Sequence, residues 1–372
     1  MYYFTFFLFA LCAFLNISGK LDKQKVQKLL LFASIWMIVH DGLRWGIGTD
    51  WRPYLFFFNN CLWTDEENFD WGYKIFNLLV RSFTDKYTVF LVLHAVFVYA
   101  VFYKFIKRYS PYPLLSFLVL YYSMLSYLGM NRQYIAIVLC LLSVPFILKK
   151  EYFKGGSIVV IASLFHMSAL MFFVVFFLNR EFKNITFLSL LVLVTVLALS
   201  RIVDKLPLDL FLFLGNSGDK MNTYMIMGDE VASSTLTTLL GIIKRGFWFI
   251  MLLYFRKRLV KIYSCFNFVI NVVFVALFFY ILFSGTILQV IVGRGLIYFN
   301  IFSILSIPFI IAGMRRLLLK QFFFILVFFW GIYSFNKGMD YYKGGRGEDI
   351  FRPYNAVYIN SDYDATGYTF EK

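Results

Sequence analysis

Three observations on the sequence predict an all-α polytopic integral membrane protein. Among its 372 residues, 60% are apolar and only 15% are Asp, Glu, Lys or Arg, whereas soluble proteins average about 45–50% apolar and about 25% charged residues. The mean hydropathy is +0.71. Apolar runs long enough to cross a bilayer, roughly 20 residues each, recur along the whole chain. The sequence therefore has room for about ten to twelve transmembrane helices, and it excludes a soluble enzyme, a disordered chain and a secreted disulfide scaffold.

Membrane topology, and not nucleic-acid binding, explains the net charge of +15. Lys and Arg collect in six short, acid-poor connectors between apolar runs, which the positive-inside rule places in the cytoplasm. The connectors contain Lys20, Lys23, Lys25 and Lys28; Lys104, Lys107 and Arg108; Lys149, Lys150 and Lys154; Arg180 and Lys183; Arg256, Lys257, Arg258 and Lys261; and Arg315, Arg316 and Lys320. The lipid bilayer is therefore an expected partner, and nucleic acid is not.

Two longer loops and the C-terminal segment have a different charge balance. The loop of about residues 41–85 mixes basic with acidic side chains, and the loop of about residues 202–235 is rich in Asp and Glu. We expect both loops outside the cytoplasm, with both chain termini. Residues 2–16 lack a basic n-region and a clear cleavage site, so they should form a retained helix. The chain is predicted to be one transmembrane domain over residues 1–335, followed by an extracytoplasmic tail over residues 336–372.

Residues 155–178 form an apolar run between two basic connectors. A single crossing here would place the later connectors, with Arg256 and Arg315, outside the cytoplasm. A tilted or re-entrant helical hairpin that turns near Phe165-His166-Met167 keeps all the connectors on one side, and leaves about ten full crossings elsewhere. Non-helical backbone at membrane depth is stable only where protein or a water-filled cavity covers it. We therefore expect His166 to lie beside a cavity on the outer side.

A polar and aromatic cluster directly follows the second predicted helix. It contains Arg44, Asp50, Arg52 and Tyr54, with glycines that permit close backbone approach and tryptophans between the charged residues. Two guanidinium groups beside flat aromatic faces are suited to sugars or phosphorylated headgroups. An interfacial aromatic belt that contains an Arg–Asp ion pair is the structural alternative.

Two arginines are expected at outward-facing helix starts. Asn131 is a suitable N-cap for the helix that begins with Arg132 and Gln133, and Gly293-Arg294-Gly295 is expected to open a second helix of the same orientation. Free backbone amides, the helix dipole and an arginine together make a diphosphate site. Each arginine alone could instead extend its side chain to the lipid headgroups.

Two histidines and one intramembrane arginine complete the candidate residues. His94 lies in a long apolar run and is expected to be a hydrogen-bonded core residue. His166 differs because the topology places it at a helix break, where a neutral imidazole can accept a hydroxyl proton. Arg245 lies within an apolar run, so it must face protein or water.

Sequence motifs for other chemistries are absent or poorly placed. Three of the four cysteines lie in apolar runs, which argues against disulfides and zinc. Three histidines scattered along the chain argue against a metal site. Asp362-Tyr363-Asp364 lies far from any apolar run and is interpreted as a solvated tail. Neither a metal nor a cofactor is expected.

Four segments resemble the EpsG-like branch of Wzy-type polysaccharide polymerases. They are GTDWRPYLFFF at 48–58, FDWGYKIFNLL at 69–79, NRQYIAIVL at 131–139 and SLFHMSALMFF at 163–173. Their order and spacing match the family across most of the chain. The family usually has Tyr where this sequence has Trp51 and Glu where it has Asp70.

The resemblance implies a metal-independent glycosyltransferase with a GT-C-like arrangement of helices, active at the outer face of the plasma membrane. Such enzymes join undecaprenyl-diphosphate-linked oligosaccharide repeats into an O-antigen, a capsule or an exopolysaccharide. A flippase and a chain-length regulator are further candidate partners. Undecaprenyl diphosphate leaves as an anion, so its stabilisation is the main electrostatic task.

The candidate residues then take two kinds of role. His166 is expected to be the base that activates the acceptor sugar, with Asp50 as a positioning residue because the nearby Arg52 favours its ionised form. The diphosphate and sugars are expected to contact Arg44, Arg52, Tyr54, Arg132, Gln133, Arg294 and Arg245. Two other functions stay open: a membrane O-acyltransferase that modifies surface sugars, and a flippase or transporter for lipid-linked oligosaccharide.

Overall fold

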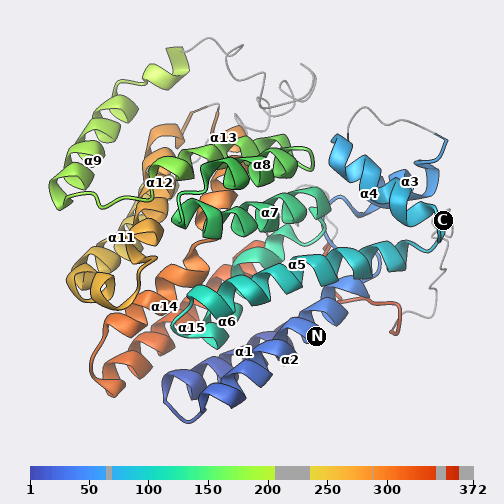
Figure 1. Cartoon of the computed structure of the whole chain (residues 1–372), viewed down its shortest axis with the longest axis horizontal. Coiled ribbons are helices and arrows are strands. Elements are labelled where there is room, and N and C mark those ends of the chain that lie inside the picture. Colours follow the sequence, from blue (N-terminus) through green and yellow to red (C-terminus); the bar gives the residue numbers. More distant parts are fainter. Residues whose placement is uncertain (64–68, 206–234, 287, 341–348, 360–372) are drawn as a thin grey trace. The chain divides into compact units, whose positions relative to one another are not determined.

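The computed structural model describes residues 1–63, 69–205, 235–286, 288–340 and 349–359. In this part of the chain the structure contains fourteen α-helices, three 3₁₀ helices and one isolated β-bridge (Figure 1). Six helices are long and apolar enough to cross a membrane, and five more apolar helices are shorter. The prediction of an all-α, multi-pass membrane protein is therefore confirmed, and the exact number of crossings stays a prediction.

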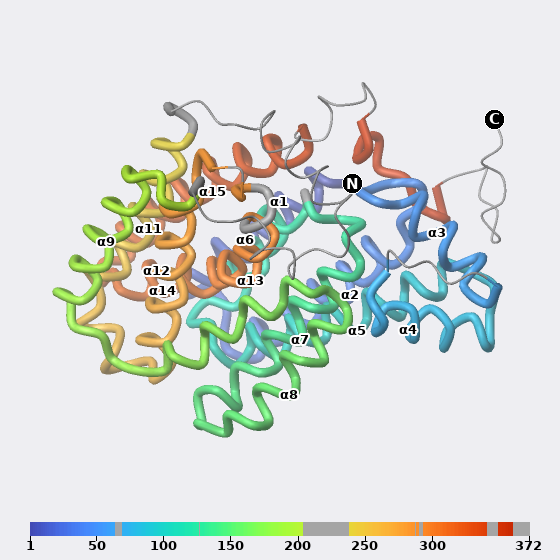
Figure 2. Tube along the Cα trace, turned by 90° about the horizontal axis from the view of Figure 1, so that it is seen from above, coloured from blue at the N-terminus to red at the C-terminus, as the bar shows by residue number. Residues whose placement is uncertain are grey.

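The helices cluster into two compact units, and each is described by itself. Unit 1 comprises Met1–Leu142, Leu164–His166 and Met314–Lys372. Its helices are α1 (Tyr2–Ile17), α2 (Lys23–Gly42), α3 (Trp51–Asn60), α4 (Trp71–Arg81), α5 (Tyr87–Tyr109), α6 (Pro113–Met124), η1 (Leu125–Tyr127), most of α7 (Asn131–Leu148) and α15 (Leu317–Asp340). Within this unit α2 packs beside α5 and α1 beside α6, and α3 lies beside α4 (Figure 2). That the whole membrane region forms one domain stays a prediction.

Three basic connectors meet at one end of unit 1. Lys320 donates from Nζ to the hydroxyl of Tyr112 at 2.8 Å, and Gln321 donates from Nε2 to the hydroxyl of Ser18 at 3.1 Å. These bonds join the α1–α2, α5–α6 and α14–α15 connectors. The positive-inside rule requires such connectors to share a side, and their proximity in unit 1 agrees with the predicted topology.

Unit 2 comprises Ser143–Ser163 and Met167–Gly313. Its elements are α8 (Tyr152–Ser163), η2 (Met167–Phe177), α9 (Asn184–Leu199), η3 (Ile202–Lys205), α11 (Thr235–Ile262), α12 (Phe266–Phe283), α13 (Gln289–Asn300) and α14 (Ser303–Gly313). α12 packs against α9, α11 and α13. Most of the predicted outer loop 202–235 lies outside the described residues.

A helical hairpin forms over residues 152–177, as the charge pattern predicts. Gly155 faces the ring of Phe176 and Gly156 faces that of Phe173, so α8 and η2 run antiparallel. Asn179 donates from Nδ2 to the carbonyl of Ile147 at 2.9 Å, which joins the two open ends of the hairpin. The chain therefore returns to the end of α7 from which it left, and the break falls at residues 164–166.

The basic connectors of unit 2 also lie together. Arg256 donates to the side chain of Asn184 at 2.7 Å and to the carbonyl of Phe182 at 2.6 Å. Arg258 donates to the carbonyl of Gly313 at 2.9 Å. With the bond between Asn179 and Ile147, these contacts gather the predicted cytoplasmic connectors of this unit at one end.

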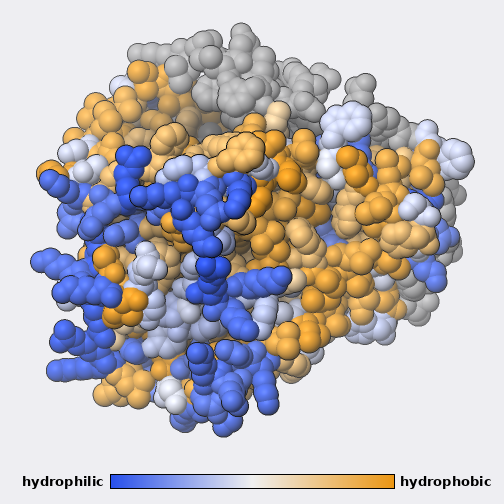
Figure 3. Space-filling view, in the orientation of Figure 1, coloured by the Kyte–Doolittle hydropathy of each residue, from blue (hydrophilic) through white to orange (hydrophobic). Residues whose placement is uncertain are grey.

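Large apolar side chains are exposed along several helices, as lipid contact requires. On α15, Phe322, Leu326 and Phe329 are between 48% and 63% exposed at helical spacing. On the face shown in Figure 3, hydrophobic side chains cover much of the helical surface. Soluble monomers rarely expose apolar surface on this scale, so these faces are suited to the hydrocarbon of a bilayer.

Part of the predicted C-terminal tail belongs to the folded structure. α15 continues to Asp340, past the predicted start of the tail at residue 336. Further on, Phe351 and Ala356 are fully buried, and Ala356 forms the isolated antiparallel bridge with Arg44. The segment 349–359 therefore packs on the loop after α2. Asp362-Tyr363-Asp364 lies outside the described residues.

Candidate functional site

Two glycine-containing loops fix the start of α7 against the loop after α2. Thr49 donates its backbone N–H to the carbonyl of Leu128 at 2.8 Å. Gly48 and Gly129 both have positive φ, and a Cβ on Gly129 would lie 2.1 Å from the carbonyl oxygen of Thr49. Only glycine permits this approach of two backbones. The contact brings two segments of the candidate site together although about 80 residues separate them in the sequence.

Asn131 links three buried groups at the start of α7. Its Oδ1 accepts from Nη2 of Arg44 at 2.8 Å, and its Nδ2 donates to the hydroxyl of Tyr87 at 3.3 Å. Its carbonyl lies 3.0 Å from Nε2 of His94, and because a carbonyl only accepts, that nitrogen carries the proton. His94 is thus a hydrogen-bonded core residue, as predicted. The Asn131 side chain thus contacts α5 and Arg44, and its role as an N-cap stays a prediction.

Arg44 is buried and hydrogen-bonds the end of α2 to the start of α7. The Arg44 side chain is 1% exposed, and its Nη1 donates to the carbonyl of Asp41 at 2.6 Å. Its guanidinium carbon lies 6.0 Å from the ring centroid of Trp51. A buried guanidinium requires hydrogen-bond partners, because the desolvation of an unpaired charge is costly. The geometry therefore assigns Arg44 to holding Asn131 in place. A direct contact with ligand, as expected from the sequence, stays a prediction.

Arg132 sits at the partly exposed centre of the cluster. Its Nη1 donates to Oδ2 of Asp70 at 2.9 Å, and its Nε donates to the hydroxyl of Tyr54 at 3.2 Å. The guanidinium carbon also lies 5.0 Å from the ring centroid of Phe69. The Arg132 and Asp70 side chains are 20% and 22% exposed. The guanidinium is thus held in a fixed orientation within a side chain that is partly exposed.

Tyr54 contributes a neutral hydroxyl to this cluster. Burial raises its pKa, and the opposing effect of the neighbouring Arg132 is smaller. The Tyr54 side chain is buried, and its oxygen accepts from Arg132, so it helps to fix the guanidinium. Arg132 is therefore a fixed cation beside a neutral hydroxyl, a setting suited to phosphate or diphosphate oxygens.

The hairpin tip lies beside the same cluster. The backbone N–H of Gly72 donates to the carbonyl of Leu164 at 2.7 Å, and a Cβ on Gly72 would meet both Leu164 and Phe165. Gly72 follows Asp70 by two residues, and Leu164–His166 belongs to unit 1. The structure thus brings the His166 segment, which is partly buried, to the N-terminus of α4.

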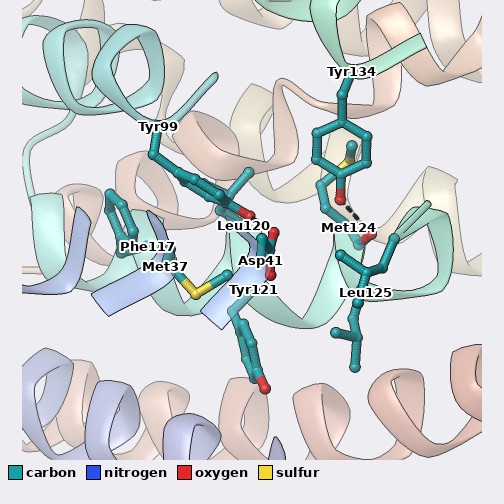
Figure 4. A pocket seen from close by; sticks show the side chains of 10 residues that line it. Met37, Asp41, Tyr99, Phe117, Leu120, Tyr121, Met124, Leu125 and Tyr134 are labelled. Atoms are coloured by element: carbon teal, nitrogen blue, oxygen red, sulfur yellow. Dashed lines mark hydrogen bonds between the residues drawn. The ribbon is translucent and has the colours of Figure 1, made fainter. Parts of the chain in front are cut away.

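A small pocket lined mostly by apolar and aromatic side chains contains Asp41, whose carbonyl accepts from Arg44. The carboxylate of Asp41 accepts from the hydroxyl of Tyr99 and from Nδ1 of His40, the latter at 2.6 Å. Figure 4 shows the Tyr99 hydroxyl pointing to Asp41, while that of Tyr121 points away. Sequence analysis missed this pair, although adjacent His and Asp residues at the end of an apolar run were a visible signal.

Other predicted residues near the cluster differ in exposure. Asp50 and Arg52 are exposed at the start of α3, where Asp50 has a φ of 52°. Gln133 is 4% exposed within α7. Asp50 and Arg52 thus lie in the same loop as Tyr54, but the carboxylate that contacts Arg132 is Asp70, which sequence analysis did not select.

Two predicted residues lie in unit 2. Arg294 is partly buried and lies near the middle of α13, which begins at Gln289, so the expectation that Gly293-Arg294-Gly295 opens a helix is wrong. Arg245 of α11 stacks on Tyr280, with its guanidinium carbon 3.6 Å from the ring centroid. Protein thus covers this arginine, as predicted. Among the described residues, no three His, Cys, Asp or Glu side chains are grouped to hold a metal ion.

Comparison with known proteins agrees with these sequence motifs. No curated protein and no solved structure matches the chain. The model of the EpsG family matches residues 25–356, a range that includes Arg44, Tyr54, Arg132 and His166. Because the match covers most of the 372 residues, the chain belongs to the EpsG family.

Proposed function

We propose that this protein polymerises undecaprenyl-diphosphate-linked oligosaccharide repeats into a surface polysaccharide at the outer face of the plasma membrane. The EpsG family is implicated in exopolysaccharide biosynthesis. The single observation that carries the finer proposal is the fixed Arg132 guanidinium, held by Asp70 and Tyr54 at the partly exposed start of an apolar helix. An arginine in that setting is suited to a diphosphate attached to a lipid.

The proposed reaction is a glycosyl transfer with a diphosphate leaving group. The bond between the anomeric carbon of the growing chain and the diphosphate oxygen breaks, and its electron pair leaves with undecaprenyl diphosphate. A hydroxyl oxygen of the next repeat bonds to that carbon, and its proton passes to a base. Donors that are already in place stabilise the developing charge without reorganisation.

Each proposed role is assigned to a residue of this chain. Arg132 and Tyr54 bind the diphosphate, and Asp70 orients Arg132. Arg52, Gln133, Arg294 and Arg245 remain proposed contacts for substrate. His166 is the proposed acceptor-activating base because its segment packs at Gly72, close to Asp70. Asp50, which is exposed at the start of α3, remains the proposed positioning residue.

Deletion of the gene separates this proposal from its two alternatives. Loss of a polymerase leaves single repeat units on carrier or anchor, so a size analysis of surface polysaccharide shows only the shortest species. Loss of a flippase leaves no repeat outside. Loss of an acyltransferase leaves polymer of normal length without acyl groups. Polymer of normal length in the deletion strain would refute the proposed function.

A further inference from the structure

α4 exposes an apolar stripe that runs along one side of the helix. Trp71, Ile75 and Leu79 are 66%, 59% and 61% exposed, and their spacing of four residues places them on one face. The opposite face, with Tyr73 and Asn77, is fully buried. Three large apolar side chains in a row are suited to hydrocarbon and not to water.

This stripe begins at the arginine cluster. Trp71 directly follows Asp70, whose Oδ2 accepts from Arg132 at 2.9 Å. Leu164, which is 46% exposed, is bonded through its carbonyl to Gly72 and extends the apolar surface at the same end of α4. A fixed cation and an exposed apolar stripe are therefore neighbours within unit 1. A ligand that contacts both has an anionic head and a hydrocarbon chain.

We propose that the α4 stripe binds the polyprenyl chain of the lipid-linked substrate, next to its diphosphate. This inference rests on the proposed function, because the diphosphate at Arg132 determines where the chain begins. Bulk lipid could also cover an apolar helix face, but it does not require a cation at one end. From Trp71 to Leu79 the stripe is about 12 Å long. It therefore contacts only the isoprene units nearest the diphosphate, and the rest of the chain stays in the bilayer.

The test compares binding of undecaprenyl diphosphate with binding of inorganic pyrophosphate, which has the head without the chain. The purified full-length protein is used in lipid nanodiscs. The double variant Ile75→Asn/Leu79→Asn replaces two of the three apolar side chains of the stripe. The matched control is Leu31→Asn/Ile35→Asn on α2, the same residue types at the same spacing, 48% and 51% exposed in the same unit. Arg132→Ala removes the cation.

The proposal predicts that the α4 variant weakens undecaprenyl diphosphate binding about ten- to a hundredfold and leaves pyrophosphate binding unchanged, while the α2 control changes neither. An α4 variant with wild-type affinity for undecaprenyl diphosphate, or an equal loss in the α2 control, overturns the proposal in favour of bulk lipid on this face. Arg132→Ala should weaken both ligands. Unchanged pyrophosphate binding in Arg132→Ala would instead contradict the diphosphate site, and with it the proposed function.

Discussion

Arg132 of α7 and Asp70 at the start of α4 form an ion pair with an Nη1–Oδ2 distance of 2.9 Å, although 62 residues separate them in the sequence. Both side chains are about one-fifth exposed, so the ion pair is only partly buried. A carboxylate on one side of a guanidinium fixes the orientation of its plane. The first prediction concerns this geometry.

Replacement of Arg132 should impair polymerisation more than it impairs folding. We expect Arg132→Ala to lower the rate about 10²–10³-fold, the usual effect of removing one donor to a developing anion. Arg132→Lys keeps the charge but loses the planar fork, so it should restore little of the rate. Asp70→Asn should have a smaller effect, because the amide oxygen still accepts from Arg132. Rates with purified lipid-linked repeats check this, and full activity of Arg132→Lys would contradict it.

Replacement of Asn131 should destabilise the protein through Arg44. Asn131→Ala removes the acceptor of Arg44 Nη2 and leaves a buried guanidinium N–H unpaired, at a cost of about 1–3 kcal/mol. Asn131→Asp keeps that acceptor and should be tolerated better. Arg52→Ala, which removes an exposed arginine from the same loop, is the control and should not change thermal stability in detergent. An unchanged melting temperature for Asn131→Ala would show that the Asn131–Arg44 bond carries no stability.

Gly129→Ala should displace the start of α7. A Cβ there would lie 2.1 Å from the carbonyl of Thr49, and φ is +104°. Gly46→Ala is the matched control, because φ is also positive there but no atom lies within 4 Å of the added Cβ. We expect Gly46→Ala to cost about 1–2 kcal/mol from backbone conformation alone, and Gly129→Ala to cost more and to reduce activity. Equal effects of the two changes on thermal stability would argue against the backbone contact.

Cysteine labelling should place the α3 loop outside the cell. Cys61, Cys140 and Cys265 are buried and Cys12 is half-buried, so Cys12→Ser provides a suitable background. Cysteines introduced at the exposed positions Asp50 and Arg52 should react with an impermeant thiol reagent in intact cells. Cysteines at Lys154 and Lys257, also exposed, should react only after permeabilisation. The reverse pattern would invert the topology and rule out an outer-face site.

His166 should be required for chemistry and dispensable for folding. As a positioned base it contributes about 10²–10⁴-fold in rate, so His166→Ala should abolish polymer while the protein still accumulates in the membrane. Membrane extracts and polymer gels from the same cells measure both properties. If His166→Gln keeps most of the activity, the residue acts only through hydrogen bonding, and Asp50 becomes the leading candidate for the base.

The general fold follows from local patterns in the sequence. Basic connectors and apolar runs predict a helical membrane protein, and the charges on both sides of residues 155–178 predict the hairpin that α8 and η2 form. These predictions succeed because each depends on residues near one another in the chain. Helix starts within apolar segments are harder, because composition does not separate Gln289 from Gly293 as the first residue of α13.

The candidate site was only partly predictable, because its contacts join distant segments. The sequence points to Arg132 and Tyr54, which the structure brings together. It does not reveal that Asp70, rather than Asp50, contacts Arg132. Nor does it reveal that Arg44 is buried, since this depends on the bond to Asn131, 87 residues further along the chain. Tertiary packing determines which residues come into contact across such separations. The local hydrophobic periodicity of the sequence carries no information about these contacts.

Reconstituted polymerisation is the most direct test of the central claim. The purified protein in nanodiscs is given undecaprenyl-diphosphate-linked repeat units with no other enzyme, and products are sized while released undecaprenyl diphosphate is measured. We predict a ladder of products longer than one repeat, with one undecaprenyl diphosphate released per bond formed, and no ladder from Arg132→Ala. Repeat units that remain single in the presence of correctly folded wild-type protein would contradict the account.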